Sequence, residues 1–285
     1  MKPAPFVYHA PKTVADVVAV LAELAPRDGR ILAGGQSLVP MMAFRMARPA
    51  HLIDINAVAG LDRLAVENAM LSISACVRHA AFHRPAVPGP TGALLAAVAS
   101  HIAHYPIRLR GTFCGSLANA DPASEWCLTA VTLGAEIIAA SLRGRRSIAA
   151  GDYFMGMMAT ALAEDELLLE TRLPLLPPDA CFGFYEFSRR AGDYALAMAL
   201  ATFRLQDGVI VEPRLGVGGV EARPRRIAAA EAVLAGRKPD AEIFRAAAEA
   251  AAAAVQPLED VHADAEFRLD LVRAVTRRAL ERALA

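Results

Sequence analysis

Two short glycine-containing segments hold the residues whose types and spacing most clearly suggest chemistry. The first is Ala33-Gly34-Gly35-Gln36-Ser37, and the second is Thr112-Phe113-Cys114-Gly115-Ser116. Glycine lets a backbone approach an anion closely and take positive φ freely, so several N–H groups can converge on one ligand. A serine at the end of each segment would add a hydroxyl donor. Either segment alone is typical of a turn, but together they indicate two halves of a pyrophosphate-binding cradle.

Neither segment matches the common phosphate-binding motifs. A Gly-x-Gly-x-x-Gly run with an acidic residue about twenty positions later would indicate a Rossmann site, and no such pattern is found. No Gly-Lys-Ser/Thr follows either segment, which excludes a P-loop. The first segment instead joins a strand-like run at 30–32 to a helical turn that starts at Leu38, whose N-terminus would face the anion.

The elements expected around these segments form two α/β lobes and a C-terminal domain. In the first lobe a helix capped by Thr13 precedes strands at 30–33 and 51–55. In the second lobe the second segment is expected to be a loop before a helix at 123–133. The proline-rich stretch 174–178 is the best domain boundary. We therefore expect lobes at about 1–58 and 59–176, followed by residues 177–285, with strands at 182–189, 195–205 and 209–219 and helices at 227–234, 241–255 and 267–283.

Several blocks of the sequence, in order, resemble the FAD-binding medium subunit of the molybdenum hydroxylases, the xanthine dehydrogenase and carbon monoxide dehydrogenase family. The blocks are Phe6-x-Tyr8-x-x-Pro11 and residues 33–41, 51–56, 106–122, 190–195 and 216–220. The resemblance implies an α+β fold: a two-lobed α/β FAD-binding domain (PCMH-like) followed by a C-terminal antiparallel sheet packed with helices.

The same resemblance implies a set of FAD contacts. Residues of the two segments inherit the pyrophosphate contacts: Gly34, Gly35, Gln36, Ser37, Thr112, Gly115 and Ser116. Ala33, Leu38 and Cys114 are also assigned to cofactor binding. Asn119 and Glu125 fall where the family contacts ribityl or ribose hydroxyls. Asp193 and Tyr194 match a loop that approaches the isoalloxazine. No catalytic acid or base is identified.

Two departures from the family pattern bear on cofactor binding. Cys114 replaces a frequent glycine; in a left-handed conformation it would cost roughly 1–2 kcal/mol, and its sulfur would crowd the phosphate. We therefore expect FAD to be held less tightly. Glu125 replaces a frequent aspartate, and its charge would repel a phosphate, which favours a contact to a sugar hydroxyl.

Composition excludes several other classes of protein. The 285 residues include 30 basic and 30 acidic side chains, so net charge gives no general attraction to nucleic acid or membranes. Basic runs at 143–146 and 223–226 are expected to be solvated loops or subunit contacts. No apolar run is long enough to span a bilayer, and no secretory signal is evident, so we expect a cytoplasmic protein.

Metal binding by this chain is not expected. The four cysteines lack Cys-x-x-Cys spacing, so any iron–sulfur cluster must belong to another chain. His79 and His83 have helical spacing, as do His101 and His104, but neither pair has a clear third ligand. The glycines at 216–219 lie in a strand pattern with no helix after them, which favours a bulge or close packing over a nucleotide loop.

The resemblance implies an oxidoreductase subunit that transfers electrons. It would bind FAD, receive electrons from [2Fe–2S] clusters on a small subunit, and pass them to an external acceptor. The molybdopterin cofactor would belong to a large subunit. Two alternatives stay open: a freestanding FAD-dependent oxidase, and an assembly subunit that binds FAD weakly or not at all.

Overall fold

A three-stranded parallel sheet in the order β1-β3-β2 forms the first lobe of the computed structural model, which describes residues 2–285. Helix α1 begins after Thr13, whose hydroxyl accepts a hydrogen bond from the N–H of Asp16. Its buried face, including Val17 and Leu21, packs beside Ile53 of β3. The elements of this lobe are β1 (Val7–His9), α1 (Val14–Leu24), η1 (Ala25–Arg27), β2 (Gly29–Leu32), α2 (Leu38–Ala43) and β3 (His51–Asp54).

The second lobe is built on a five-stranded antiparallel sheet in the order β4-β5-β10-β6-β7. The basic run 143–146, predicted as a solvated loop or a subunit contact, is exposed, but it is a loop only at Arg143, because β7 begins at Gly144. Arg143 and Arg146 form ion pairs with Asp165 and Glu166. The strands are β4 (Leu64–Glu67), β5 (Met70–Ser74), β6 (Glu136–Ser141), β7 (Gly144–Ala149) and β10 (Leu167–Pro174).

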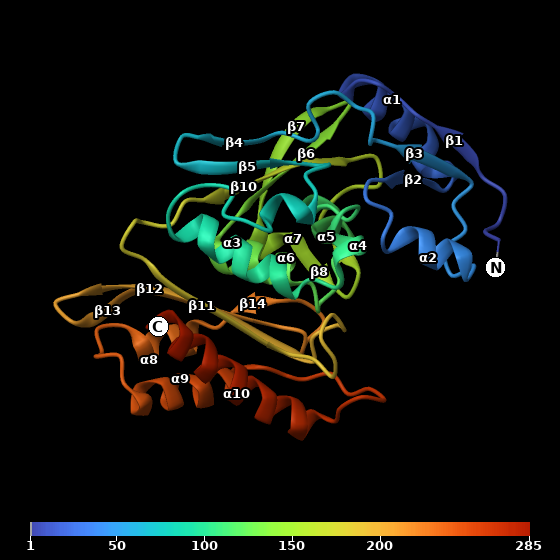
Figure 1. Cartoon of the computed structure of the whole chain (residues 1–285). Helices are drawn as coiled ribbons and strands as arrows, with labels where there is room; N and C mark the ends of the chain where they lie inside the picture. The colour runs from blue at the N-terminus through green and yellow to red at the C-terminus, as the bar shows by residue number, and fades with distance from the viewer. Residues whose placement is uncertain (1) are drawn as a thin grey trace.

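A layer of short helices lies between this sheet and the C-terminal sheet (Figure 1). Trp126 is completely buried here and packs against Phe82 and Phe113. Residues 113–119 form a helix, so the expectation that the second glycine segment is a loop is wrong. The elements are η2 (His79–Phe82), α3 (Pro90–His101), α4 (Tyr105–Arg108), α5 (Phe113–Asn119), α6 (Glu125–Leu133), α7 (Ala150–Tyr153), β8 (Phe154–Gly156) and β9 (Ala159–Thr160).

The C-terminal sheet has the order β11-β12-β13-β14, and α8, α9 and α10 cover its outer face (Figure 1). Side chains along β12 alternate: Met198 joins the core of the helical layer, whereas Ala199 joins the core under α8–α10. A Cβ on Gly216 would lie 2.0 Å from Thr132 Oγ1 of α6, so this glycine permits the close packing that its pattern predicts. The elements are β11 (Cys181–Phe187), β12 (Ala197–Gln206), β13 (Val209–Gly218), β14 (Arg225–Arg226), α8 (Ala228–Leu234), α9 (Ala241–Ala254) and α10 (Ala265–Ala283).

The second basic run is part of this sheet rather than a free loop. Arg225 and Arg226 make up β14, and they form ion pairs with Glu221 and Glu231. The α+β architecture predicted from the sequence is therefore confirmed, while each basic run continues from a loop into a strand. None of the helices within residues 2–285 has the length and hydropathy needed to cross a bilayer.

Candidate functional site

The first glycine segment leaves β2 and turns sharply into α2. Gly35 has a φ of +71°, in the left-handed region that favours glycine. A Cβ on Gly34 would lie 2.4 Å from the carbonyl oxygen of Arg110 and 2.6 Å from Gly111 Cα. Glycine at position 34 therefore lets the first segment touch the backbone that leads into the second. The side chain of Gln36 donates to the carbonyl of Gly34 over 2.9 Å, which fixes the turn.

The second glycine segment is the first turn of α5. The Thr112 hydroxyl accepts a hydrogen bond of 2.9 Å from the N–H of Gly115 and so caps the helix. A Cβ on Gly115 would lie 2.5 Å from this hydroxyl and 3.9 Å from the Cβ of Ala33. Glycine therefore permits the cap, whereas the contact with Ala33 leaves room for a Cβ.

A chain of polar side chains joins the two segments behind the cradle. Asn56, just after β3, donates to the carbonyl of Ala33 over 2.8 Å. Arg78, just before η2, donates both to the Asn56 side-chain oxygen and to the carbonyl of Arg110. A carbonyl of the first segment and one just before the second are thus held by one connected pair of side chains, with one member from each lobe.

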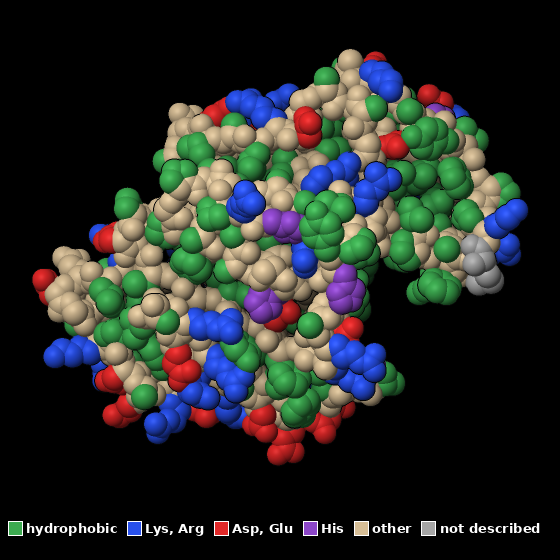
Figure 2. Space-filling model, viewed as in Figure 1, with side chains coloured by type: hydrophobic (Ala, Val, Ile, Leu, Met, Phe, Trp, Pro, Cys, Tyr) green, Lys and Arg blue, Asp and Glu red, His purple; other side chains and the backbone are tan. Residues whose placement is uncertain are grey.

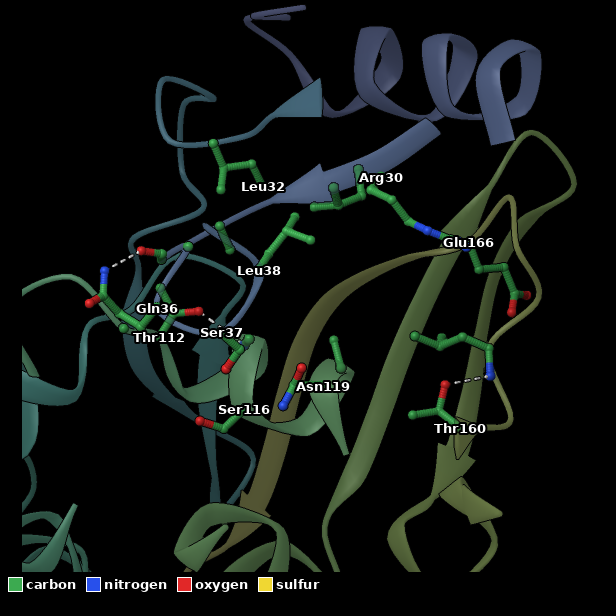
Figure 3. A pocket seen from close by; sticks show the side chains of 18 of the residues that line it. Arg30, Leu32, Gln36, Ser37, Leu38, Thr112, Ser116, Asn119, Thr160 and Glu166 are labelled. Carbon is green, nitrogen blue, oxygen red and sulfur yellow. Dashed lines mark hydrogen bonds between the residues drawn. The ribbon is translucent and has the colours of Figure 1, made fainter. Parts of the chain in front are cut away.

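A cavity of about 530 Å³ lies between the two segments. Figure 3 shows Ser37, Ser116 and Asn119 at one end of it, and Thr160 and Glu166 at the other. A second cavity of about 200 Å³ continues from the first end toward α6 and the loop that carries Tyr194. Five residues line both cavities, which makes them continuous: Gln36, Ser37, His79, Ser116 and Asn119.

Nearly all the residues predicted to bind a ligand line one of these two cavities. Those in the first are Ala33, Gly34, Gly35, Gln36, Ser37, Leu38, Thr112, Gly115, Ser116 and Asn119. Glu125, Asp193 and Tyr194 line the second. No hydrogen bond within residues 2–285 uses the side-chain hydroxyl of Ser37 or Ser116, so both can donate to a ligand.

The expected conflict between Cys114 and a phosphate does not occur. Cys114 is helical rather than left-handed, and its side chain is 2% exposed. The thiol lies 3.2 Å from the carbonyl of Ile73 and 3.4 Å from the Thr171 hydroxyl, on the side of α5 that faces the sheet. Only the backbone N–H of Cys114, in the first turn of α5, remains as a means of contacting a ligand.

Acidic side chains line the second cavity, and one of them, Glu125, is mostly protonated near pH 7. Burial, together with repulsion from Glu186, raises the pKa of Glu125 to about 8. Burial also raises the pKa of Asp121 on the same wall. A protonated Glu125 can donate as well as accept a hydrogen bond. Its charge would therefore repel a phosphate less near pH 7 than the sequence analysis expects.

Several residues of the cavity walls were missed by the sequence analysis. His79 was considered only as half of a metal-binding pair, yet it lines both cavities. Thr160 comes from the β8–β9 hairpin, which no pattern indicated. Glu166 precedes β10 and is paired with Arg146, which lowers its pKa. Only the three-dimensional packing of distant segments brings these residues to the cavity.

Comparison with known proteins gives a consistent result along the whole chain. Residues 4–176 match the family described as the FAD binding domain in molybdopterin dehydrogenase, and residues 182–283 match the CO dehydrogenase flavoprotein C-terminal domain. The chain is 38% identical to the nicotine 6-hydroxylase medium subunit of Paenarthrobacter nicotinovorans, over 96% of this chain and 95% of that protein.

Solved structures agree in fold. Carbon monoxide dehydrogenase from Hydrogenophaga pseudoflava superposes with a TM-score of 0.95 at 34% identity, covering 100% of this chain and 99% of the other. Quinoline 2-oxidoreductase from Pseudomonas putida 86 superposes with a TM-score of 0.92 at 37% identity, covering 100% of this chain and 99% of the other. The resemblance found in the sequence is confirmed, and this chain belongs to the family of FAD-binding medium subunits of molybdenum hydroxylases.

Proposed function

We propose that this chain is the electron-transfer subunit of a molybdenum hydroxylase complex. Residues 1–176 would form the FAD-binding domain and residues 177–285 the C-terminal domain. Bound FAD would supply the redox chemistry, linking [2Fe–2S] clusters on a small partner subunit to an external acceptor. Substrate would be oxidised at the molybdopterin cofactor of a large partner subunit, in the cytoplasm.

The continuity of the two cavities at the glycine segments carries this proposal. Each volume is in or near the range of about 300–1,000 Å³ found for small-molecule sites, and together they suit an extended ligand. Backbone groups of Gly34 and Gly35 and the hydroxyls of Ser37 and Ser116 would hold a pyrophosphate where the cavities meet. Because the Cys114 side chain points away, the reason for considering an assembly subunit with weak FAD binding is lost.

The second cavity suits the flavin end of the dinucleotide. Asn119 and the protonated carboxyl of Glu125 would hydrogen-bond to hydroxyl groups there. Tyr194 is 70% exposed and also borders a further cavity of about 700 Å³, on the side of the C-terminal domain. A flavin placed beside Tyr194 would be accessible from solvent, which supports delivery of electrons to an external acceptor.

An exposed apolar surface near the cradle supports contact with partner subunits. Figure 2 shows apolar side chains gathered over β1 and α2. This N-lobe patch consists of Phe6, Val7, Tyr8, Val39, Phe44 and Met46. Phe44 and Met46 are 67% and 75% exposed, which is unusual for large apolar side chains clustered on one surface.

Reconstitution tests the cofactor assignment. The purified chain would be denatured, refolded without flavin and titrated with FAD, with absorbance read in the flavin bands. We expect stoichiometric uptake, and release of intact FAD on denaturation. A chain that takes up no FAD would refute the proposal.

Purification of the native complex tests the electron-transfer role. We expect iron-containing and molybdenum-containing subunits to copurify with the chain, and Phe44→Glu to reduce their recovery without changing FAD content. Removing FAD from the complex should abolish reduction of an external dye while the iron–sulfur clusters still become reduced by substrate. Activity of the isolated chain as an oxidase would favour the freestanding enzyme instead.

A further inference from the structure

His79 occupies the junction of the two cavities, and its environment fixes which ring nitrogen carries the proton. Trp126 Nε1 lies 2.9 Å from His79 Nδ1. An indole nitrogen can only donate a hydrogen bond, so Nδ1 must be the unprotonated acceptor. The single proton of the neutral imidazole therefore lies on Nε2. The backbone N–H of His79 donates to the carbonyl of Gly111, which anchors η2 beside the second glycine segment.

The imidazole stays neutral over the range in which the protein would function. Burial, with the nearby charges of Arg108 and Arg78, lowers the pKa of His79 to about 3. A charged ring would also need to donate from Nδ1, where it would meet the N–H of Trp126. The ring is therefore a permanent single donor rather than a pH switch.

The Nε2 side of the ring faces the cradle. It lies against Gly111, where an added Cβ would come within 2.5 Å of Nε2. No residue in the described chain accepts a hydrogen bond from Nε2. Nε2 is not fully enclosed by protein atoms. Because His79 lines both cavities, this nitrogen keeps an opening to them. A ligand oxygen in the cavities can therefore accept a hydrogen bond from Nε2.

We propose that His79 Nε2–H is a direct donor to a pyrophosphate oxygen of FAD, and that Trp126 acts as a positioning residue that holds the required tautomer. This inference rests on the proposed function, because it takes FAD as the ligand. It adds a side-chain donor from η2 to a cradle otherwise made from the two glycine segments and their serines.

Two substitutions at the same position isolate the Nε2 donor. Both His79→Gln and His79→Leu remove the Nδ1 that accepts from Trp126. Gln keeps an amide that can place an N–H near the position of Nε2, whereas Leu has no polar atom. Since a hydrogen bond to a charged oxygen is worth about 1.5–3 kcal/mol, we expect His79→Leu to weaken FAD binding by about 10- to 100-fold. His79→Gln should stay within about fivefold of wild type. His83→Gln, on the exposed end of the same turn, is the control and should not change the affinity.

A spectroscopic measurement on the unaltered chain tests the contact directly. With ¹⁵N-labelled histidine, the His79 ring should show a protonated Nε2 and an unprotonated Nδ1, and FAD should shift the Nε2–H signal downfield. Riboflavin, which lacks phosphate, should not produce that shift. Because this measurement needs no substitution, it tests the contact between His79 and FAD even if His79→Leu fails to fold.

The outcomes separate this inference from the proposed function. If the wild-type chain takes up no FAD, both fall. If it binds FAD but His79→Leu and His79→Gln lose affinity equally, or the Nε2–H signal does not move, the contact proposed for His79 is refuted and FAD binding stands.

Discussion

The raised pKa of Glu125 leads to a prediction about stability that can be tested without cofactor. Glu125 begins α6, and its carboxyl is enclosed by the second cavity, near Glu186 and Asp121. Its pKa is about 8 in the folded chain, against an ordinary value of 4.5. The folded state thus prefers the protonated carboxyl, and the unfolded state releases that proton above about pH 4.5. The contribution of Glu125 to stability is therefore lost as pH rises from about 4.5 to about 8, and this contribution changes no further above that.

The magnitude follows from the separation of the two pKa values. Each pH unit between them is worth about 1.4 kcal/mol, so at pH 7 the cost is at most about 3.5 kcal/mol. Water in the cavity relieves part of the desolvation, so about 2 kcal/mol is expected. Glu125→Gln removes the titrating group and keeps a polar side chain of similar size. Its free energy of unfolding should match that of wild type near pH 4.5 and exceed it by about 2 kcal/mol at pH 7–8.

Trp126 provides the measurement. It is the only tryptophan in the chain, is fully buried and follows Glu125 directly, so its fluorescence reports unfolding of this region. Urea titrations of the flavin-free wild type and Glu125→Gln would be compared between pH 4.5 and 8.5. Glu242→Gln, which alters an exposed glutamate in the first turn of α9, serves as the matched control. If the free energies of unfolding of wild type and Glu125→Gln differ by the same amount at every pH, Glu125 does not titrate as proposed. The same conclusion follows if Glu125→Gln is the less stable protein at pH 8.

Three further substitutions address the cradle. Gly34→Ala would drive a methyl group into the carbonyl of Arg110, so it should abolish FAD uptake and lower stability by about 1–3 kcal/mol. Thermal melting and flavin titration measure the two effects. Gly151→Ala is the control, because the space around its Cβ is open, and it should change neither FAD uptake nor stability. Thr112→Ala removes the cap of α5 and should cost about 1 kcal/mol in urea unfolding, while Thr112→Ser should recover most of it. Cys114→Gly should cost about 1 kcal/mol of stability and so lower the melting temperature. It should not tighten FAD binding, because the thiol faces the sheet. A gain in FAD affinity in a fluorescence titration would show instead that the thiol crowds the ligand.

The cradle itself could be predicted from the sequence because its chemistry depends on glycine. Gly34 and Gly35 form a sharp turn that other residues would block, and such positions are visible in the sequence alone. The direction of the Cys114 side chain could also be predicted, but only by first recognising that a helix begins after Thr112. With Thr112 as an N-cap, helical spacing puts Phe113, Cys114 and Leu117 on the buried face and leaves Gly115 and Ser116 toward the cavity.

Other features had no local signal. β7 consists largely of arginine and small residues, and only its pairing with β6 and the ion pairs at Arg146 make it a strand. His79 lies in a short 3₁₀ turn, and its role depends on Trp126, which is distant in sequence. The sequence-based analysis of histidine spacing tested only for metal ligands, so a histidine locked as a neutral donor escaped it.

The link from Asn56 to Arg78 has a consequence for how the cofactor leaves. Because one partner belongs to each lobe, separating the lobes breaks this link and opens the cradle in a single event. Release of FAD by separation of the lobes would then require this link to break in addition to the contacts with the ligand. By the same linkage, saturating FAD would hold the lobes together, so flavin content would report whether the N-terminal half of the chain has finished folding.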